Sequence, residues 1–389
     1  MRSEGKKRIR VAATFLALLF AGCVAPPTVP PKPEPGAAVT LQAISFAALP
    51  GWTADDPTTA WKAFHSGCRA LRKKPEWRET CPDAEAPVPS VQEARRFFEE
   101  RFTPYRVVNA DGSDEGLITG YFEPVLRGSR KASAVFRHPV YGLPDDLLVV
   151  DLAEARPELK GMRLRGRLEG RRVVPYWTRA DIENGRAALR GRELLWVDDP
   201  LDAFFLQVQG SGQVQLENGE VLRLGYADQN GHTYTSVGRV LVERGDLTVE
   251  QASMQGIRAW AEKNPDRMAE LLNQNSSYVF FRELPPGSPG PVGSLGTPLA
   301  AGRSLAVDPR VIPLGAPVFL STRMPGGGEP IHRLMAAQDT GGAIKGAVRA
   351  DLFWGSGDEP GRLAGVMREP GRLWVLLPRG QPPETFLPK

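Results

Sequence analysis

The sequence predicts a mainly β protein with flanking helices, and three observations support this prediction. Two stretches near the start, at about 56–73 and 90–102, carry apolar residues at helical spacing. Most later apolar residues occur in short runs bounded by Gly, Pro and Asp, which is typical of strands. The chain has 389 residues, 41% hydrophobic and 24% charged, which predicts a buried core and about two domains.

The N-terminus has the pattern of a bacterial lipoprotein signal. Basic residues at 6–10 precede an apolar run at 11–20 that is too short to span a bilayer, and Gly22 and Cys23 follow it. A small residue directly before a cysteine predicts a signal peptide over residues 1–22 and lipid attachment at Cys23. An ordinary cleaved signal or an uncleaved anchor is the alternative. Val24, in place of Asp, favours sorting to the outer membrane.

Six prolines lie between residues 24 and 36, so residues 23–40 are predicted to form an extended tether. The tether would hold the folded part off the membrane on the periplasmic side. In that oxidising compartment Cys68 and Cys81 can form a disulfide, but two buried free thiols are an equal alternative on sequence spacing.

The remaining elements follow from apolar periodicity and turn residues. Strands are predicted at 117–121, 135–141, 147–152, 171–177, 194–197, 204–209, 213–216 and 221–226. A capping box at Thr248 and Gln251 predicts a helix that carries Met254 and Trp260, and Pro265 opens another. A Gly- and Pro-rich loop at 285–298 predicts a domain boundary. A compact set of strands then follows at 304–307, 316–321, 333–338, 350–354 and 372–377, with a short helix at 359–367.

Several common catalytic motifs are absent from the sequence. It contains no H-E-x-x-H, no G-x-S-x-G and no Walker loop, and its four histidines, one of them His232, are isolated from one another. His232 is predicted to be a hydrogen-bonded residue and not a catalytic base. The net charge of +4 is small for this length, which argues against a nucleic-acid binder. The sequence predicts neither a metal site nor a cofactor.

The best candidates for chemistry are three aspartates in Gly-rich or Pro-rich turns. Asp308 lies in A-V-D-P-R-V-I-P-L-G, Asp339 in Q-D-T-G-G-A-I-K-G and Asp351 in A-D-L-F-W-G. Two carboxyls brought together in apolar surroundings cannot both ionise cheaply, so one keeps its proton and can act as a general acid. The alternative is that all three serve turns through hydrogen bonds to the backbone.

These three motifs, in this order, resemble the three-aspartate domain of the membrane-bound lytic murein transglycosylase A family. The resemblance extends upstream to T-G-Y-F-E-P-V at 119–125, V-Q-G-S-G at 208–212, G-Y-A-D-Q-N-G-H-T-Y-T-S-V-G at 225–238 and S-M-Q-G-I-R-A-W at 253–260. It implies a double-psi β-barrel catalytic domain from residues 41–124 and 285–389, an inserted β domain over 125–284, and a cleft between them that binds peptidoglycan glycan strands.

The resemblance also implies the roles of individual residues. Asp351 would be the catalytic acid, Asp339 its close partner and Asp308 a more structural member. The implied substrate-binding residues are Thr119, Gly120, Tyr121, Gln207, Gln209, Gly210, Ser211, Gly212, Gly342 and Lys345. The implied reaction forms a 1,6-anhydro sugar, because the C6 hydroxyl of N-acetylmuramic acid, and not water, attacks the sugar carbon.

Two other functions remain open on the sequence. One is a hydrolytic muramidase that uses Asp339 and Asp351 as a conventional pair. The other is a lipoprotein that binds peptidoglycan without cleaving it and gathers other cell-wall enzymes. The Arg-rich stretch 163–172 departs from the family pattern and is predicted to be a solvated strand pair, with contact to anionic peptidoglycan as the alternative.

Overall fold

The computed structural model describes residues 40–83, 85–159, 162 and 164–387. The predicted signal peptide, Cys23 and the tether up to residue 39 lie outside the described residues. In the described part the protein is mainly β with flanking helices, as predicted, and its strands fall into three sheets. No helix in this part has the length and hydropathy needed to cross a bilayer.

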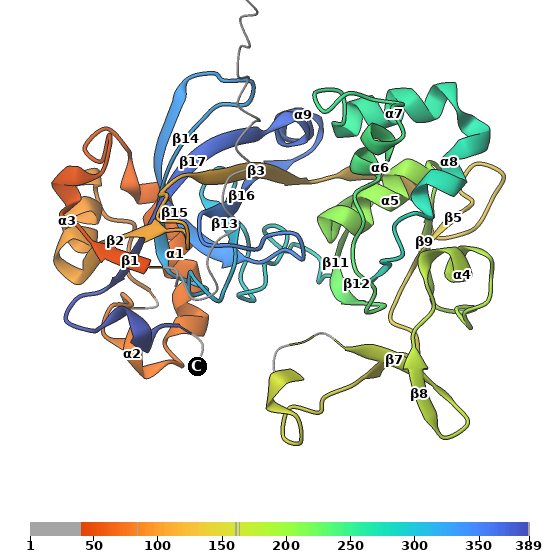
Figure 1. Cartoon of the computed structure of the whole chain (residues 1–389), viewed down its shortest axis with the longest axis horizontal. Helices are drawn as coiled ribbons and strands as arrows, with labels where there is room; N and C mark the ends of the chain where they lie inside the picture. Colours follow the sequence, from red (N-terminus) through yellow and green to blue (C-terminus); the bar gives the residue numbers. More distant parts are fainter. Residues whose placement is uncertain (1–39, 84, 160–161, 163, 388–389) are drawn as a thin grey trace, which may run out of the picture. The chain divides into compact units, whose positions relative to one another are not determined.

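The largest sheet has eight strands drawn from both ends of the chain (Figure 1). In spatial order they are β1 (Thr40–Ala43), β2 (Phe102–Val108), β17 (Arg368–Pro378), β14 (Pro317–Arg323), β15 (Pro330–Asp339), β13 (Ser304–Val307), β16 (Arg349–Ser356) and β3 (Gly116–Glu123). β17 also pairs with β3, so the strand pairings run in a closed ring through β17, β14, β15, β13, β16 and β3.

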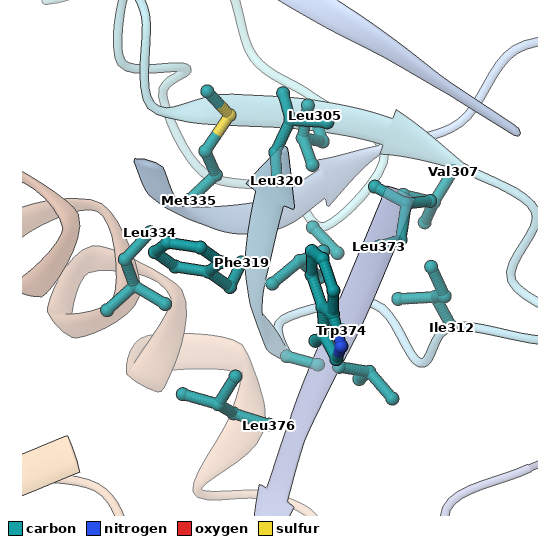
Figure 2. Close-up of a cluster of buried hydrophobic side chains, with 14 of the residues drawn as sticks. Leu305, Val307, Ile312, Phe319, Leu320, Leu334, Met335, Leu373, Trp374 and Leu376 are labelled. Atoms are coloured by element: carbon teal, nitrogen blue, oxygen red, sulfur yellow. The ribbon is translucent and has the colours of Figure 1, made fainter. Parts of the chain in front are cut away.

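Buried apolar residues of these strands form the main core, which Figure 2 shows around Phe319 and Trp374. Consecutive residues are buried on β13, β14 and β17, whereas buried and half-buried residues alternate at the start of β16. On β16, Ala350 and Leu352 belong to this core, while Arg349 and Asp351 alternate with them and point to the other face. This alternation is what brings the acid out of an otherwise apolar strand.

Four helices come from the same two parts of the chain as this sheet: α1 (Pro57–Leu71), α2 (Pro75–Arg78), α3 (Val91–Arg101) and α9 (Asp358–Val366). The two predicted N-terminal helices are confirmed as α1 and α3. Asp56 caps α1 by accepting a hydrogen bond from the Thr58 N–H at 2.9 Å, and Ser90 and Glu93 form a reciprocal capping box on α3. The predicted helix at 359–367 is confirmed as α9.

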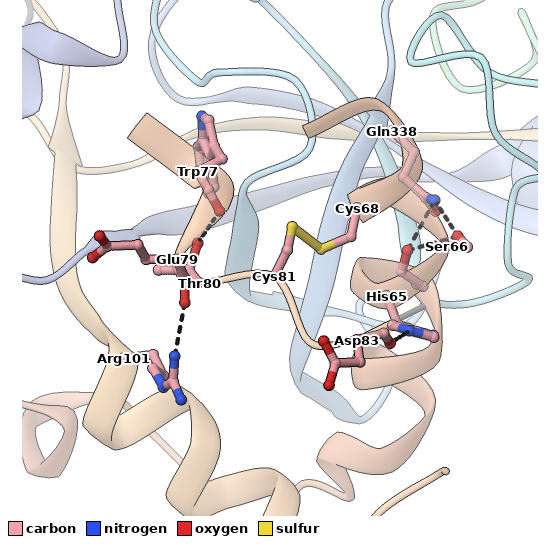
Figure 3. Close-up of a disulfide and its surroundings, with 11 residues drawn as sticks. His65, Ser66, Cys68, Trp77, Glu79, Thr80, Cys81, Asp83, Arg101 and Gln338 are labelled. Carbon is pink, nitrogen blue, oxygen red and sulfur yellow. Dashed lines mark hydrogen bonds between the residues drawn. A yellow bond between two sulfur atoms is a disulfide. The ribbon is translucent and has the colours of Figure 1, made fainter. Parts of the chain in front are cut away.

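Cys68 of α1 and Cys81 form a disulfide, with their Cα atoms 5.6 Å apart (Figure 3). This decides between the two states that the sequence left open. The bond joins α1 to the segment that follows α2, beside the core residue Trp77.

The segment from Val125 to Glu283 builds the other two sheets. Six strands pair in the order β12 (Val279–Glu283), β11 (Val221–Gln229), β10 (Ser211–Leu216), β4 (Val125–Ser129), β9 (Glu193–Val197) and β5 (His138–Tyr141). Three more, β6 (Leu148–Val149), β7 (Arg165–Glu169) and β8 (Arg172–Pro175), form a small sheet, which confirms a strand pair in the described part of the Arg-rich stretch. The helices here are α4 (Arg179–Glu183), α5 (Pro200–Gln209), α6 (Val237–Glu243), α7 (Met254–Lys263) and α8 (Pro265–Leu272). Single 3₁₀ turns occur along the chain at Phe46–Ala48, Pro157–Leu159 and Pro383–Thr385.

One strand prediction was wrong: residues 204–209 are the second half of helix α5. Asp199 caps this helix through the N–H groups of Leu201 and Asp202, and Pro200 occupies its first turn. Gly210, at φ 78°, ends it in the left-handed conformation. The apolar run was therefore one face of a helix whose start and stop signals lie just outside the run.

The predicted capping box at Thr248 and Gln251 forms, with reciprocal hydrogen bonds of 3.0 and 3.3 Å, but it closes a turn and not a helix. Helix α7 begins at Met254, three residues after Gln251, and its N-cap Ser253 accepts a hydrogen bond from the Gly256 N–H. Strands β1, β2, β4 and β12 were not predicted. β2 follows α3 without an intervening Gly or Pro, so no breaker marked the change.

Candidate active site

Strand register brings Asp339 and Asp351 to the same region. Ala306 of β13 pairs with Asp339 of β15 on one side and with Asp351 of β16 on the other. Asp351 in turn pairs with Thr119 of β3. The two carboxylates therefore flank a single intervening strand, which puts their backbones roughly 10 Å apart at the usual strand spacing. The residue between them, Ala306, has only a methyl side chain.

Tyr121 contacts Asp339 directly and lies beside the strand that bears Asp351. Its hydroxyl donates a hydrogen bond to Asp339 Oδ2 at 3.1 Å, and its ring packs against Phe353, two residues beyond Asp351. Burial, together with the negative charges of Asp339 and Asp351, raises the pKa of Tyr121 well above its ordinary value. The phenol is therefore a hydrogen-bond donor at neutral pH and not a phenolate.

Asp351 is partly buried and accepts one hydrogen bond from the described residues, from the Thr119 hydroxyl to Oδ1 at 2.7 Å. Burial raises its pKa to about 6, although the hydrogen bond from Thr119 and the charge of Arg349 act in the opposite direction. The charge of Asp339 adds to the rise. An appreciable fraction of Asp351 is thus protonated near neutral pH, as a general acid must be.

Asp339 has more hydrogen-bond donors than Asp351. The N–H and hydroxyl of Ser294 and the N–H of Thr340 each donate to Oδ1 at 2.9 Å, while Tyr121 donates to the other oxygen. Burial raises the pKa of Asp339 as well, and these hydrogen bonds oppose the rise. Of the two acids, Asp339 is the one held by donors that stabilise a carboxylate, and its charge helps Asp351 to keep a proton.

Asp308 is in a different environment. Its side chain is buried and accepts hydrogen bonds from Arg310 and from the N–H of Gly346 at 2.9 Å. Burial alone would raise the pKa of Asp308, but the hydrogen bonds from Arg310 and Gly346 lower it to about 2. Asp308 is therefore ionised at neutral pH and ties the end of β13 to the loop that follows Asp339.

The remaining predicted residues lie in several environments. A Cβ at Gly120 would meet Trp354 Nε1 at 2.6 Å and Ala364 of α9, so this glycine faces away from the acids and permits close helix packing. Gly342 and Lys345 are exposed in the loop after Asp339.

The residues predicted around V-Q-G-S-G serve mainly as supports for neighbouring backbone. Gln209 accepts a hydrogen bond from the Phe122 N–H at 3.1 Å, and Gln207 accepts one from Arg179 at 2.7 Å. Gly210 ends α5, Ser211 begins β10, and Gly212 is buried against Leu206. Gln209 thus attaches this segment directly to the strand that bears Thr119 and Tyr121.

Sequence reasoning missed Ser294, which supplies two of the hydrogen bonds to Asp339. It lies in the Gly- and Pro-rich loop that was interpreted as a domain boundary, 45 residues from its partner. No local pattern marks such a contact. His232 is hydrogen-bonded, as predicted, through Nε2 to the Tyr176 carbonyl at 2.7 Å. Within the described part, no cluster of three or more His, Cys, Asp or Glu side chains is arranged to hold a metal ion.

Two family models match this chain. The family model described as "MltA specific insert domain" matches residues 117–282, and the model described as "3D domain" matches residues 303–377. Membrane-bound lytic murein transglycosylase A of Escherichia coli K12 is 35% identical over 281 residues, which cover 70% of this chain and 68% of that protein.

Solved structures are similar over a larger share of the chain. MltA from Neisseria gonorrhoeae is 41% identical, with a TM-score of 0.77, covering 92% of this chain and 98% of that one. E. coli MltA with bound chitohexaose is 27% identical, with a TM-score of 0.60, covering 87% of this chain and 91% of that one. By sequence identity, coverage and fold together, this chain belongs to the membrane-bound lytic murein transglycosylase A family.

Proposed function

We propose that this protein is a lytic transglycosylase that cleaves the β-1,4 bond between N-acetylmuramic acid and N-acetylglucosamine in peptidoglycan. The relatives named above are lytic murein transglycosylases, and E. coli MltA binds chitohexaose, a glycan with the same linkage. One observation on this chain carries the proposal. Asp351 is a carboxyl with a pKa of about 6, on a strand face beside a second acid.

The proposed reaction uses Asp351 twice. Its protonated carboxyl donates the proton to the glycosidic oxygen as the bond to C1 of the muramic residue breaks. The C6 hydroxyl of the same residue attacks C1, and the resulting Asp351 carboxylate accepts the proton of that hydroxyl. The product is 1,6-anhydro-N-acetylmuramic acid, and the acid is regenerated without water. Holding C6 near C1 is a proximity effect, so a second catalytic carboxylate is not required.

The other site residues have supporting roles in this proposal. Thr119 orients Asp351 through the 2.7 Å hydrogen bond and stabilises the carboxylate that forms after proton transfer. Asp339, held by Ser294, Thr340 and Tyr121, raises the proton affinity of Asp351 by its charge. Asp308 shapes the loop that carries Gly342 and Lys345, which would contact the glycan.

We extend the proposal to the domain arrangement. A double-psi β-barrel at residues 41–124 and 285–389 is supported by the closed ring of six paired strands, all of which come from these two segments. An inserted domain at 125–284 is supported by the separate sheets that this segment builds. The glycan would bind in a cleft between them, along the face of β3 that bears Thr119 and Tyr121. This place is favoured because β3, in the eight-stranded sheet, is followed directly by β4, in the six-stranded sheet.

The location follows from the N-terminal sequence together with the relatives. The curated relatives are membrane-bound, which supports a membrane-associated location. The finer proposal is a lipid on Cys23 that anchors the protein to the periplasmic face of the outer membrane, where other cell-wall enzymes would be potential partners.

The test is digestion of purified peptidoglycan by wild-type protein and by Asp351→Asn. Asn keeps the shape and can accept the Thr119 hydrogen bond but cannot donate a proton as an acid, so we expect release of anhydro-sugar fragments to fall by at least about a hundredfold. Mass spectrometry of the released fragments measures this. Asp266→Asn, at an exposed position on α8, is the control and should retain full activity.

Two results would contradict the proposal. Reducing ends that carry one additional water would indicate a hydrolytic muramidase instead. Binding of peptidoglycan by the wild-type protein with no fragments released would indicate a non-catalytic lipoprotein.

A further inference from the structure

Arg349 lies beside the proposed acid and is not explained by the reaction above. It precedes Asp351 by two residues on β16, so both side chains project from the same face, about 7 Å apart along the strand. Arg349 pairs with Leu117 of β3, just as Asp351 pairs with Thr119. The guanidinium group therefore follows the carboxyl group of Asp351 along the same face of β16.

The hydrogen-bond acceptors of Arg349 among the described residues are backbone carbonyls. Its Nη1 donates to the backbone carbonyls of Leu117 at 3.4 Å and Ala350 at 2.5 Å, and it makes no salt bridge to a carboxylate in this part of the chain. Three other arginines form ion pairs with buried acids: Arg310 with Asp308, Arg303 with Asp55 and Arg223 with Glu123. Arg349 is partly buried, and burial lowers its pKa while the charge of Asp351 opposes this.

A partly buried guanidinium whose hydrogen bonds go only to backbone carbonyls retains donors for a ligand. The group has five N–H donors in a planar fork that matches a carboxylate, and the two hydrogen bonds above use only Nη1. Partial burial of the Arg349 charge costs free energy. A ligand that supplies a negative charge to the guanidinium group would offset this cost.

The substrate carries such a charge at one kind of sugar. N-acetylmuramic acid differs from N-acetylglucosamine by a lactyl ether on C3, which ends in a carboxyl group. That carboxyl is either free or extended by a peptide stem that bears carboxylates of its own. The C1 atom of the same muramic residue must lie at Asp351, so the C3 substituent lies about one ring width away from the acid.

We propose that Arg349 binds a carboxylate on the C3 substituent of the muramic residue and so selects that residue, over N-acetylglucosamine, for the position next to Asp351. This inference depends on the proposed transglycosylase activity. It assigns Arg349 a role in substrate specificity in addition to its effect on the charge of Asp351.

The experiment compares wild-type protein with Arg349→Gln, Arg349→Lys and Arg323→Gln on two substrates. One is glycan strands with peptide stems, and the other is strands stripped of stems by an amidase, which leaves the lactyl carboxylate free. Arg323, exposed at the end of β14, is the control for loss of a positive charge. Affinity for chitohexaose, which has no C3 carboxylate, and the melting temperature of each variant report on the groove and the fold.

We expect Arg349→Gln to lower kcat/KM roughly tenfold or more, mainly through KM, on at least one anionic substrate. Its affinity for chitohexaose should stay within about twofold of wild type. Loss on stem-bearing strands alone would assign the ligand to the peptide carboxylates, and loss on stripped strands would assign it to the lactyl carboxylate. Arg349→Lys, which keeps the charge but not the fork, should recover part of the loss.

Two outcomes would overturn the inference. In one, Arg349→Gln leaves KM unchanged on both substrates and alters only the pH profile, so that Arg349 acts solely on Asp351. In the other, Arg349→Gln weakens chitohexaose binding as much as it raises KM, so that its role is not directed at a carboxylate. Absence of anhydro products with wild-type protein would instead contradict the proposed function itself.

Discussion

Asp308, Asp339 and Asp351 are chemically identical side chains, and their neighbours give them different proton affinities. Arg310 and the Gly346 N–H lower the pKa of Asp308 to about 2 despite its burial. Asp351, with a single hydroxyl donor and a second acid nearby, has a pKa of about 6. Of these two acids, only Asp351 has a pKa close to neutral pH, which is why the proposal assigns proton donation to it.

The pKa of Asp351 predicts the pH dependence of activity. Proton donation needs the neutral carboxyl, so kcat/KM should fall as pH rises through about 6. The Thr119 hydrogen bond favours the ionised form and lowers this pKa, so Thr119→Val should move the descending limb to higher pH. Arg349, Asp339 and Tyr121 also face Asp351 and are unchanged in this variant.

The measurement is release of anhydro sugars between pH 4.5 and 8, since these limits bracket the pKa at which about half of the acid is ionised. Thr322→Val is the control, because the hydroxyl of Thr322 on β14 donates to the Pro370 carbonyl on β17, outside the candidate site. If the descending limb does not move in Thr119→Val, the fall in activity with pH does not report the ionisation of Asp351.

At the scale of elements, strand β3 carries candidate site residues, and the chain after it continues into β4 of the six-stranded sheet. At its end Glu123 is fully buried and accepts hydrogen bonds from Arg223 at 2.6 Å, Gln213 at 2.8 Å and Ser356 at 2.5 Å. These donors come from β11, β10 and β16. One carboxylate therefore joins the end of β16, the strand that bears Asp351, to two strands of the other sheet.

This pairing predicts a large effect on stability when one partner is removed. Arg223→Met leaves a buried carboxylate without its counterion, which should lower the free energy of unfolding by about 3 kcal/mol. The double variant Arg223→Met with Glu123→Gln should lose less than the sum of the two single changes, because no uncompensated charge remains. Urea denaturation followed by tryptophan fluorescence measures both.

Arg130→Met is the matched control for this prediction. Its partner Glu283 and Arg130 itself are both substantially exposed, so the cost there should be below about 1 kcal/mol. If the two arginine variants lose equal stability, the buried position of Glu123 has no special energetic effect.

At the scale of the whole molecule, the largest sheet unites strands from residues 40–123 with strands from 304–378. The chain leaves this sheet after β3 and returns to it at β13, so contacts distant in sequence build the strands that carry the candidate site. The disulfide between Cys68 and Cys81 lies in the N-terminal contribution, where α1 packs against the core beside β15.

The disulfide predicts a stability difference between oxidised and reduced protein. It closes a loop with a sequence separation of 13, which should stabilise the folded state by roughly 3 kcal/mol relative to the reduced chain. Differential scanning calorimetry should therefore give a lower melting temperature after reduction. The double variant Cys68→Ser with Cys81→Ser should melt at the lower temperature with or without reductant. Equal melting of oxidised and reduced wild-type protein would contradict this prediction.

The sequence by itself determined the chemical groups and much of the local structure. Three aspartates in turn-rich motifs, helices α1, α3, α8 and α9 and most C-terminal strands were predictable, because caps, turn residues and apolar periodicity are local signals. Only the tertiary structure decided which aspartates meet. Register across β15, β13, β16 and β3 brings Asp339, Asp351 and Thr119 together, and long-range contacts bring Ser294 to Asp339 and Arg349 to the Leu117 carbonyl. Pairing between distant strands depends on packing of the whole core, so no local pattern in the sequence encodes it.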